Sequence, residues 1–170
     1  MAFIKSVRGH LPQFGKGCWL ADNASIIGDI ICGDNCTFWF QSVVRGDVAA
    51  IRIGDEVNIQ DGVIIHGTFE KADTTIGDQV SIGHRAIIHG CTVGSRVLIG
   101  MGAIVMDHAL IQDQVIVGAG SLVLENSVLE SGFMYAGSPV RKIKAIDPKQ
   151  FEFFVTRTAR NYQMYASWFE

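Results

Sequence analysis

The stretch TIGDQVSIGHRAIIHG, residues 75–90, repeats one short pattern. Ile76, Ile82 and Ile88 stand six residues apart, and glycine or histidine follows each of them. One face of an α-helix would repeat every 3.6 residues, and one face of a flat strand every two. A period of six fits neither and indicates a repeat architecture.

The same step of six runs through most of the chain. Apolar residues occupy its anchor positions, namely Phe14, Leu20, Ile26, Cys32, Phe38, Val44, Ile53, Ile59, Ile65, Ile76, Ile82, Ile88, Val93, Ile99, Val105, Ile111, Val117 and Val123. Three steps are irregular: nine residues separate Val44 from Ile53, eleven separate Ile65 from Ile76, and five separate Ile88 from Val93.

Counted along the chain, each irregular step comes after every third anchor. Three six-residue repeats therefore form one coil of a helical fold, and the inserted residues form loops at a single corner of that coil. The sequence therefore predicts a parallel β-helix of triangular cross-section over about residues 11–125. Its anchors should point inward and its coils should stack at about the strand spacing, ~4.8 Å.

The composition changes after residue 145, which divides the chain into a β-helix with an N-terminal lead-in, 1–145, and a C-terminal segment, 146–170. Asp147 resembles a helix N-cap, Pro148 suits the first helical position, and Gln150 suits the third position of a capping box. We expect an amphipathic helix over 148–168 that packs on the β-helix or on a neighbouring subunit. Its apolar residues at helical spacing are Phe151, Phe154, Val155, Tyr162, Tyr165, Ala166 and Phe169.

The composition argues against several classes of partner. The net charge is −3, and no cluster of basic residues suggests binding to nucleic acid or to an anionic membrane surface. No apolar run approaches the ~20 residues of a membrane span, and the N-terminus lacks the apolar core of a secretory signal. The four cysteines form no CxxC pair and CGDNC, residues 32–36, is not a regular zinc motif. We expect reduced thiols in a cytoplasmic protein, with Cys32 in the core.

Two histidines fall into register once the chain is wound into coils. His66 and His89 each follow a third anchor, so they should stack on one outer face, one coil apart. At a spacing of ~4.8 Å two imidazoles can converge on one ion through Zn–N bonds of ~2.0–2.1 Å. His84 follows a second anchor by two residues and lies toward another corner, so it should complete the site only across the interface of a cyclic trimer.

Residues that stand at the same position in successive coils stack into columns, and these columns place further polar residues near the histidines. Arg45 should lie one coil below His66, and Asp47 follows in the same turn. Asp61 should lie below His84 as its hydrogen-bond acceptor. Gln60 should lie below Gly83, whose missing side chain leaves Gln60 free to reach a water on the metal. His108 has no partner in register and is expected to be structural, and His10 receives no role.

The chain resembles the gamma class of carbonic anhydrases. The resemblance runs from about residue 11 to 145 and includes the C-terminal helix. It rests on VVRGD (43–47), NIQDGVIIHG (58–67), IGHRAIIHGC (82–91), IGMGAIVMD (99–107) and AGSPVRKIK (136–144), of which the second and third are specific.

This resemblance implies a left-handed β-helix and a homotrimer with three interfacial metal ions, either Zn²⁺ or alternatively Fe²⁺ or Co²⁺. It assigns the metal ligands to His66, His84 and His89, with His84 donated by the neighbour. It assigns an interfacial ion pair to Arg45 and Asp47. The implied reaction is reversible hydration of CO2 to bicarbonate by a zinc-bound hydroxide.

The resemblance also implies the residues around the reacting water. The glutamine that orients this water corresponds to Gln60, beside Asn58 and Asp61, and Tyr162 is the candidate for a helix tyrosine that approaches the metal. The chain departs from the best-known active type at Val48, where that type has glutamate. Its loop 67–75 carries only Glu70 and Asp73 as acids, so the proton shuttle is unassigned.

Three other functions remain open at this point. One is an acyltransferase on the same repeat, although such enzymes usually carry a catalytic histidine in an extended loop. Another is hydrolysis of an acyl-CoA thioester by a metal-activated water. The third is a catalytically silent trimeric scaffold that retains its metal.

Overall fold

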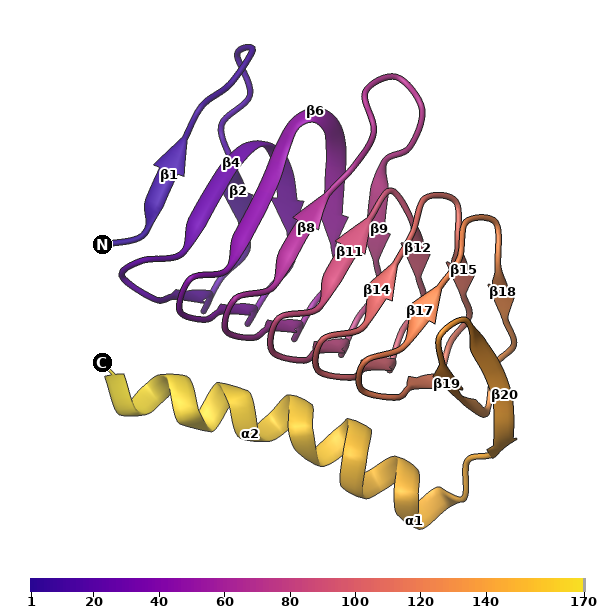
Figure 1. Cartoon of the computed structure of the whole chain (residues 1–170). Coiled ribbons are helices and arrows are strands. Elements are labelled where there is room, and N and C mark those ends of the chain that lie inside the picture. The colour runs from indigo at the N-terminus through magenta and orange to yellow at the C-terminus, as the bar shows by residue number, and fades with distance from the viewer. Residues whose placement is uncertain (170) are drawn as a thin grey trace.

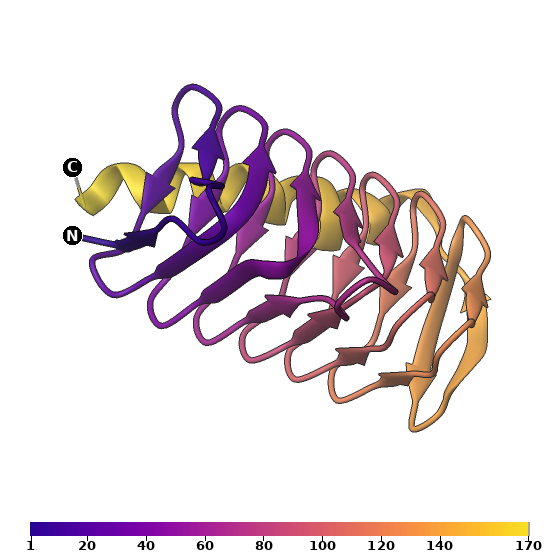
Figure 2. The same cartoon turned by 90° about the horizontal axis from the view of Figure 1, so that it is seen from above.

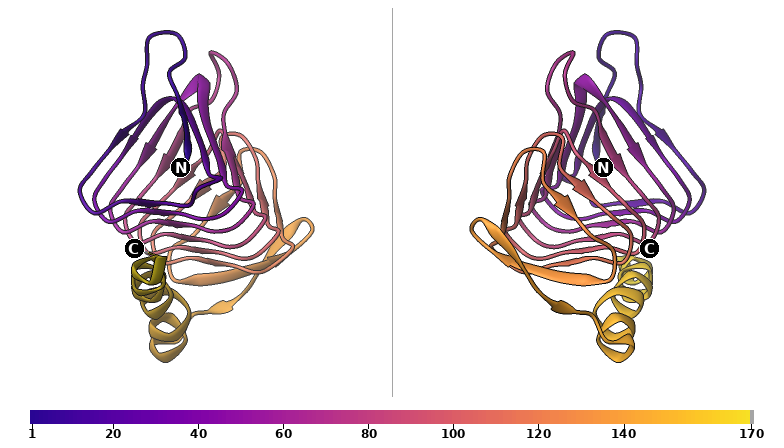
Figure 3. Two further views of the ribbon diagram at one scale, coloured as in Figure 1. Left: turned by 90° about the vertical axis from the view of Figure 1, so that its left-hand side faces the viewer. Right: turned by 90° about the vertical axis from the view of Figure 1, so that its right-hand side faces the viewer.

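The computed structural model describes residues 1–169, and Glu170, the end of the predicted segment 146–170, lies outside the described residues. The strands wind into a left-handed parallel β-helix of about seven turns, with a helix beside it (Figure 1). Seen along its axis, the solenoid is a triangular prism whose longest loops leave from one corner (Figure 3). This confirms the fold that the hexad pattern predicts.

The three faces of the prism are numbered in the order in which each coil passes them, so the first, second and third anchors of a coil lie on the first, second and third faces. The second face is one eight-stranded sheet. In spatial order its strands are β20 (Val140–Ala145), β19 (Phe133–Gly137), β16 (Ile116–Val117), β13 (Leu98–Ile99), β10 (Ser81–Ile82), β7 (Asn58–Ile59), β5 (Thr37–Phe38) and β3 (Trp19–Leu20). All neighbours in it are parallel except β19 and β20, which form an antiparallel pair at the end of the solenoid.

The first and third faces belong to one twelve-stranded sheet, because β4 (Ser25–Cys32) and β6 (Val43–Ile53) continue around the corner between them. On the first face lie β2 (Gln13–Phe14), β9 (Thr74–Ile76), β12 (Thr92–Val93), β15 (Leu110–Ile111) and β18 (Val128–Leu129). On the third face lie β1 (Phe3–Lys5), β8 (Ile64–His66), β11 (Ile87–His89), β14 (Ile104–Val105) and β17 (Leu122–Val123).

The anchors form the core of the prism. Those from Ile59 through Val123 are all buried, as is Cys32, whereas Phe14 and Leu20 are half-buried because they lie in the first coil. The predicted end of the β-helix near residue 125 is wrong. Buried Leu129 and Tyr135 pair with Ile111 and Val117 of the preceding coil. The period of six continues through them, but a tyrosine anchor is easily missed in a search for aliphatic residues.

The C-terminal helix begins at Pro148, where Asp147 Oδ1 accepts hydrogen bonds from the amides of Lys149 and Gln150. It comprises α1 (Pro148–Phe151), a π-helical turn (Glu152–Thr156), α2 (Arg157–Ala166) and a final 3-10 turn (Ser167–Phe169). The helix runs back along the solenoid, so its last turn lies at the same end of the prism as β1 (Figures 1 and 2). It contacts the second face at β5 and β7.

The face that the helix buries differs in part from the predicted one. Val155, Ala159 and Ala166 are buried, whereas Phe154 is exposed. The π-helical turn inserts a residue into the helical spacing between Phe151 and Tyr162, so an ideal period of 3.6 residues does not carry one buried face through the whole helix. No helix within residues 1–169 is both long and apolar enough to cross a membrane.

Candidate metal centre

His66 and His89 lie side by side on the third face of the prism. The two residues are direct partners in the parallel pairing of β8 and β11. Their imidazoles meet edge to face, with His66 Nδ1 3.2 Å from His89 Nε2. Two Zn–N bonds of ~2.1 Å at a tetrahedral angle place their nitrogens about 3.4 Å apart. The spacing of the pair therefore already suits one shared zinc ion.

A carboxylate holds the outer nitrogen of each ring. Asp47 Oδ1 lies 3.1 Å from His66 Nε2, and Asp107 Oδ1 lies 2.5 Å from His89 Nδ1. A neutral imidazole carries one proton, and each carboxylate can only accept, so each outer nitrogen carries the proton. The inner nitrogens then turn lone pairs toward each other. This is the carboxylate–histidine arrangement that orients metal ligands in proteins.

The surroundings of His66 favour its neutral form. Its side chain is only 17% exposed. Burial, and the nearby Arg45 cation, lower the pKa of His66 more than Asp47 raises it. A neutral imidazole is the form that binds a metal.

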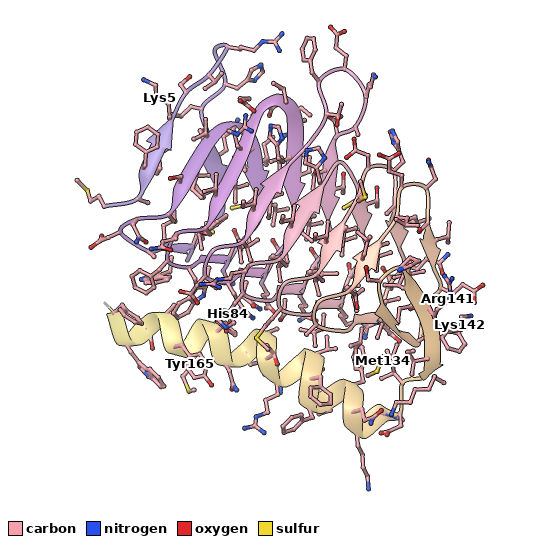
Figure 4. The ribbon with its side chains drawn as sticks, in the orientation of Figure 1. Lys5, His84, Met134, Arg141, Lys142 and Tyr165 are labelled. Carbon is pink, nitrogen blue, oxygen red and sulfur yellow. The ribbon has the colours of Figure 1, made fainter. Side chains whose placement is uncertain are left out.

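His84 lies at the corner between the second and third faces, facing the C-terminal helix (Figure 4). Asp61 Oδ2 lies 2.8 Å from its Nδ1, which fixes the ring and leaves Nε2 as the acceptor nitrogen. The hydroxyl of Tyr162 lies 3.2 Å from that Nε2. Burial raises the pKa of Tyr162 to about 12, so the phenol keeps its proton and can donate a hydrogen bond to His84 Nε2.

Gln60 is held between its neighbours. It is buried one coil below Gly83, where Ile59 pairs with Ile82. Its Nε2 donates to Asn58 Oδ1 at 3.0 Å, and its Oε1 accepts from the amide of His84 at 3.2 Å. Asn58 in turn donates to Ser81 Oγ at 2.7 Å. This chain of bonds fixes the orientation of the amide and leaves one Nε2 proton of Gln60 available.

A close approach of coils explains the glycine above Gln60. A Cβ atom on Gly83 would lie 2.7 Å from the backbone nitrogen of Met101 in the next coil. Such a contact would force the coils apart, so only glycine allows them to stack here.

A largely apolar cavity of about 410 Å³ opens beside His84, Gln60 and Tyr162. It lies between the second face and the C-terminal helix. Its other walls include Leu98, Ile99, Met101, Ile116, Met134 and Phe154.

Arg45 and Asp47 form an ion pair within one chain, with Arg45 Nη1 2.5 Å from Asp47 Oδ2. Because the other oxygen of Asp47 holds His66, Arg45 also positions the histidine indirectly. Of the two loop acids, Asp73 accepts a hydrogen bond from the amide of Ala50 at 2.8 Å, which ties the loop to β6. Glu70 is exposed at the loop tip with a positive φ of 54°.

Two residues near the site are absent from the sequence-based prediction. Asp107 binds His89, and Thr68 Oγ1 donates to the second oxygen of Asp107 at 2.5 Å. The sequence does contain a signal for Asp107, because it follows the third anchor Val105 by two residues and so lies one coil above His89 and one residue further along. Thr68 lies in the insertion, where the period of six gives no position.

The structure does not bring His84 together with His66 and His89 in one chain. Among residues 1–169, one group of three histidine, cysteine or acidic residues has its ligand atoms within 4.8 Å of one another, and that group is Cys18, Cys32 and Cys36. All four cysteines are free thiols, and Cys32 is buried. The interpretation that CGDNC is not a metal motif considers linear spacing alone, and it misses this cluster.

No protein-family model matches the chain. Protein YrdA of Escherichia coli is 41% identical over 153 residues, which cover 86% of this chain and 83% of that protein. Mitochondrial gamma carbonic anhydrase 1 of Arabidopsis thaliana is 36% identical over 94% of this chain but only 59% of its own length.

Two solved structures match nearly the whole fold. A hexapeptide transferase family protein of Anaplasma phagocytophilum superposes with a TM-score of 0.93 at 34% identity, covering 99% of this chain and 98% of the other. A putative acetyltransferase of Bacillus cereus gives a TM-score of 0.95 at 30% identity, covering 99% and 96%. The chain belongs to the hexapeptide-repeat β-helix proteins, within the family that resembles gamma carbonic anhydrases.

Proposed function

We propose that this protein is a metal-dependent gamma-type carbonic anhydrase that interconverts CO2 and bicarbonate. The observation that carries the proposal is the pair of imidazoles, His66 and His89, with facing nitrogens 3.2 Å apart and outer nitrogens on carboxylates. The Arabidopsis relative and a Geobacillus kaustophilus relative, 37% identical over 64% of this chain, are both named carbonic anhydrases.

The proposal requires a homotrimer in which His84 of a neighbouring copy completes each ligand set. The outward-facing row of the third face, which is exposed or half-buried in the single chain, supports this assembly because it is aliphatic in every coil of the site region. Its members, at the positions just before the third anchors, are Val43, Ile64, Ile87, Ile104 and Leu122. The equivalent row on the first face mixes polar and apolar residues, including Arg52, Thr75 and Thr92.

Three histidines are a donor set that suits Zn²⁺ and leaves an open position, with Fe²⁺ and Co²⁺ as alternatives. When bound, the metal lowers the pKa of a coordinated water toward ~7 and so supplies the nucleophile for CO2.

Side chains of this protein would orient the metal ligands and contact the substrate. Asp47, Asp61 and Asp107 hold the three imidazoles in the correct tautomer. Gln60, fixed by Asn58, directs an amide proton into the site. Tyr162, whose raised pKa keeps the phenol protonated near neutral pH, offers a hydroxyl that can hydrogen-bond the substrate. Leu98 and Met134 make the wall beside them apolar, which suits a nonpolar molecule such as CO2.

The first experiment is stopped-flow hydration of CO2 by zinc-loaded protein, with His89→Ala as the blank. The proposal predicts a rate well above that blank. Zinc that is bound at one ion per interface, with a rate equal to the blank, would exclude carbonic anhydrase activity.

The sharing of ligands has a separate test. His84→Ala and His66→Ala chains each lose zinc as pure trimers, but a mixture reassembled from both contains interfaces with all three histidines. Zinc should return to some interfaces in the mixture. If it does not, the ligands are not shared between copies.

A second candidate is hydrolysis or transfer of an acyl group, and a specific observation favours it. The cavity of about 410 Å³ beside His84 is larger than CO2 requires and has mostly apolar walls. The Bacillus cereus structure with the same fold carries the description of a putative acetyltransferase. If zinc-loaded protein turns over acetyl-CoA but not CO2, this second candidate is the function. If it turns over neither, a non-catalytic scaffold remains as the function.

The four free thiols support a reducing compartment, and we propose the cytoplasm as the site of action.

A further inference from the structure

Three cysteine sulfurs meet at the N-terminal end of the prism. The Sγ atoms of Cys18, Cys32 and Cys36 all lie within 4.8 Å of one another, and Cys18 and Cys32 are 3.9 Å apart. Cys32 ends β4 on the first face. Cys18 and Cys36 lie one coil apart in the corner that leads to β3 and β5 on the second face.

This corner is the edge of the prism opposite the third face. The cysteines therefore lie apart from His66 and His89, and away from the aliphatic row that the proposed trimer would bury. Cys18 is half-buried while Cys32 and Cys36 are buried, so the cluster has one side open to solvent.

Residues at the equivalent positions of other coils show that the fold does not require cysteine at positions 32 and 36. In the next four coils the residues at the position of Cys36 are Val57, Val80, Val97 and Val115, all fully buried. The residues at the position of Cys32 are Ile53, Ile76, Val93, Ile111 and Leu129. Packing alone is thus satisfied by aliphatic side chains, and cysteine replaces them only where three sulfurs can meet.

The geometry suits a thiophilic ion. Three sulfurs that lie within 4.8 Å of one another, with one pair at 3.9 Å, surround a centre about 2.3–2.8 Å from each of them. Small side-chain rotations bring that distance to a metal–sulfur bond of ~2.3 Å. Within the described chain, no histidine or carboxylate completes a group of four ligand atoms with these sulfurs. Structural zinc prefers four protein ligands, whereas thiolate donors without nitrogen or oxygen partners select soft ions such as Cu(I).

We propose that Cys18, Cys32 and Cys36 form a three-thiolate site for a soft monovalent cation, with Cu(I) as its preferred ion. In the free chain, the Cys18 thiol donates to the Gly33 carbonyl at 3.2 Å and the Cys36 thiol donates to the Gly54 carbonyl at 3.1 Å. On binding, three S–H bonds are replaced by three Cu–S bonds and the protons leave to solvent, with no change of oxidation state.

The experiment is an anaerobic titration of the reduced, full-length protein with Cu(I) in competition with bicinchoninate. The wild type should remove one Cu(I) per chain from the indicator. Cys36→Val and Cys32→Val introduce the residue types of the neighbouring coils, so they should preserve the fold while weakening Cu(I) binding at least 100-fold. Cys18→Ser, at the most exposed position, provides a third variant with little risk to the core.

Two controls separate this site from other copper binding. Cys91→Val removes the remaining buried thiol, and the double variant His66→Ala/His89→Ala removes the imidazole pair. Both should retain one tightly bound Cu(I) per chain. The proposal is overturned if the wild type does not compete, if the three cluster variants bind as tightly as the wild type, or if binding disappears with the histidines.

Discussion

The phenol of Tyr162 and the imidazole of His84 are joined by a hydrogen bond of 3.2 Å between elements that lie 78 residues apart in the chain. Tyr162 also packs edge to face against Trp39, which fixes its ring on the second face. The bond uses His84 Nε2, the nitrogen that the proposed metal requires. The C-terminal helix thus covers a ligand nitrogen in the isolated chain, and metal binding must displace the phenol.

Replacing Tyr162 by phenylalanine should therefore tighten zinc binding. The Tyr162→Phe variant does not have to break a hydrogen bond worth ~1 kcal/mol, which corresponds to about a five-fold higher zinc affinity. Competition with a zinc chelator measures this change. Tyr165→Phe, one helical turn away, is the matched control and should bind zinc as the wild type does. Weaker binding in Tyr162→Phe would mean that the phenol helps to hold the metal.

The contact between Asp107 and His89 should influence metal affinity strongly. In Asp107→Asn the side-chain amide can donate to Nδ1, which favours the tautomer with the proton on the metal-binding nitrogen. We expect zinc affinity to fall 10–100-fold, as is typical when such a partner is removed. Glu125→Gln, an exposed carboxylate in the following coil, is the control. Equal affinity for both variants would contradict the role given to Asp107.

The aliphatic row on the third face makes a prediction about assembly. Ile104 on the third face and Leu110 on the first face have almost the same exposure, 39% and 38%. Ile104→Arg places a charge in the proposed interface, so we expect mostly monomers by light scattering and loss of zinc. Leu110→Arg should remain a trimer with zinc bound. A trimer in both variants would place the interface on another face.

The ion pair between Arg52 and Asp29 predicts how stability changes with acid. The two charges lie 2.8 Å apart, and the bond from Arg52 lowers the pKa of Asp29 in the folded state. A lowered pKa stabilises the fold above the unfolded value of ~3.9, and that contribution disappears as the pH falls through the folded value.

We therefore expect Asp29→Asn to unfold at a lower temperature than the wild type at pH 7. The difference between the two should shrink as the pH falls below about 4. Thermal unfolding followed by circular dichroism at a series of pH values measures both. Glu70→Gln, at an exposed loop tip, should follow the wild type at every pH. A difference between Asp29→Asn and wild type that persists undiminished at low pH would rule out the ion pair as its cause.

Much of this fold follows from one regularity in the sequence. Because an anchor every six residues must point inward, the period alone is enough to place Gln60 below Gly83 and His66 beside His89. Two features of the fold are not predicted from this period, and each has a physical reason. Leu129 and Tyr135 keep the period but change the residue type at the anchor, and the π-helical turn near Val155 shifts a helix face that ideal spacing predicts.

The contacts between polar side chains are harder to predict from the sequence than the stacking of residues in successive coils. Thr68 reaches Asp107 from an insertion whose conformation no period describes. Cys18 and Cys36 stand at equal distances before the anchors Leu20 and Phe38, so their stacking follows from the register, which a linear cysteine motif does not use. His84 and Tyr162 come from separate elements, and only the path of the helix along the second face brings them together.

The antiparallel strand β20 determines where the solenoid stops growing. A bare parallel coil presents a row of unpaired backbone groups on which another molecule could continue the ladder. On the second face β20 reverses direction, covers β19 and carries the exposed cations Arg141 and Lys144, while Lys142 pairs with Glu130. Like charges on two such edges repel, so this face of the terminal coil resists end-to-end polymerisation into fibres.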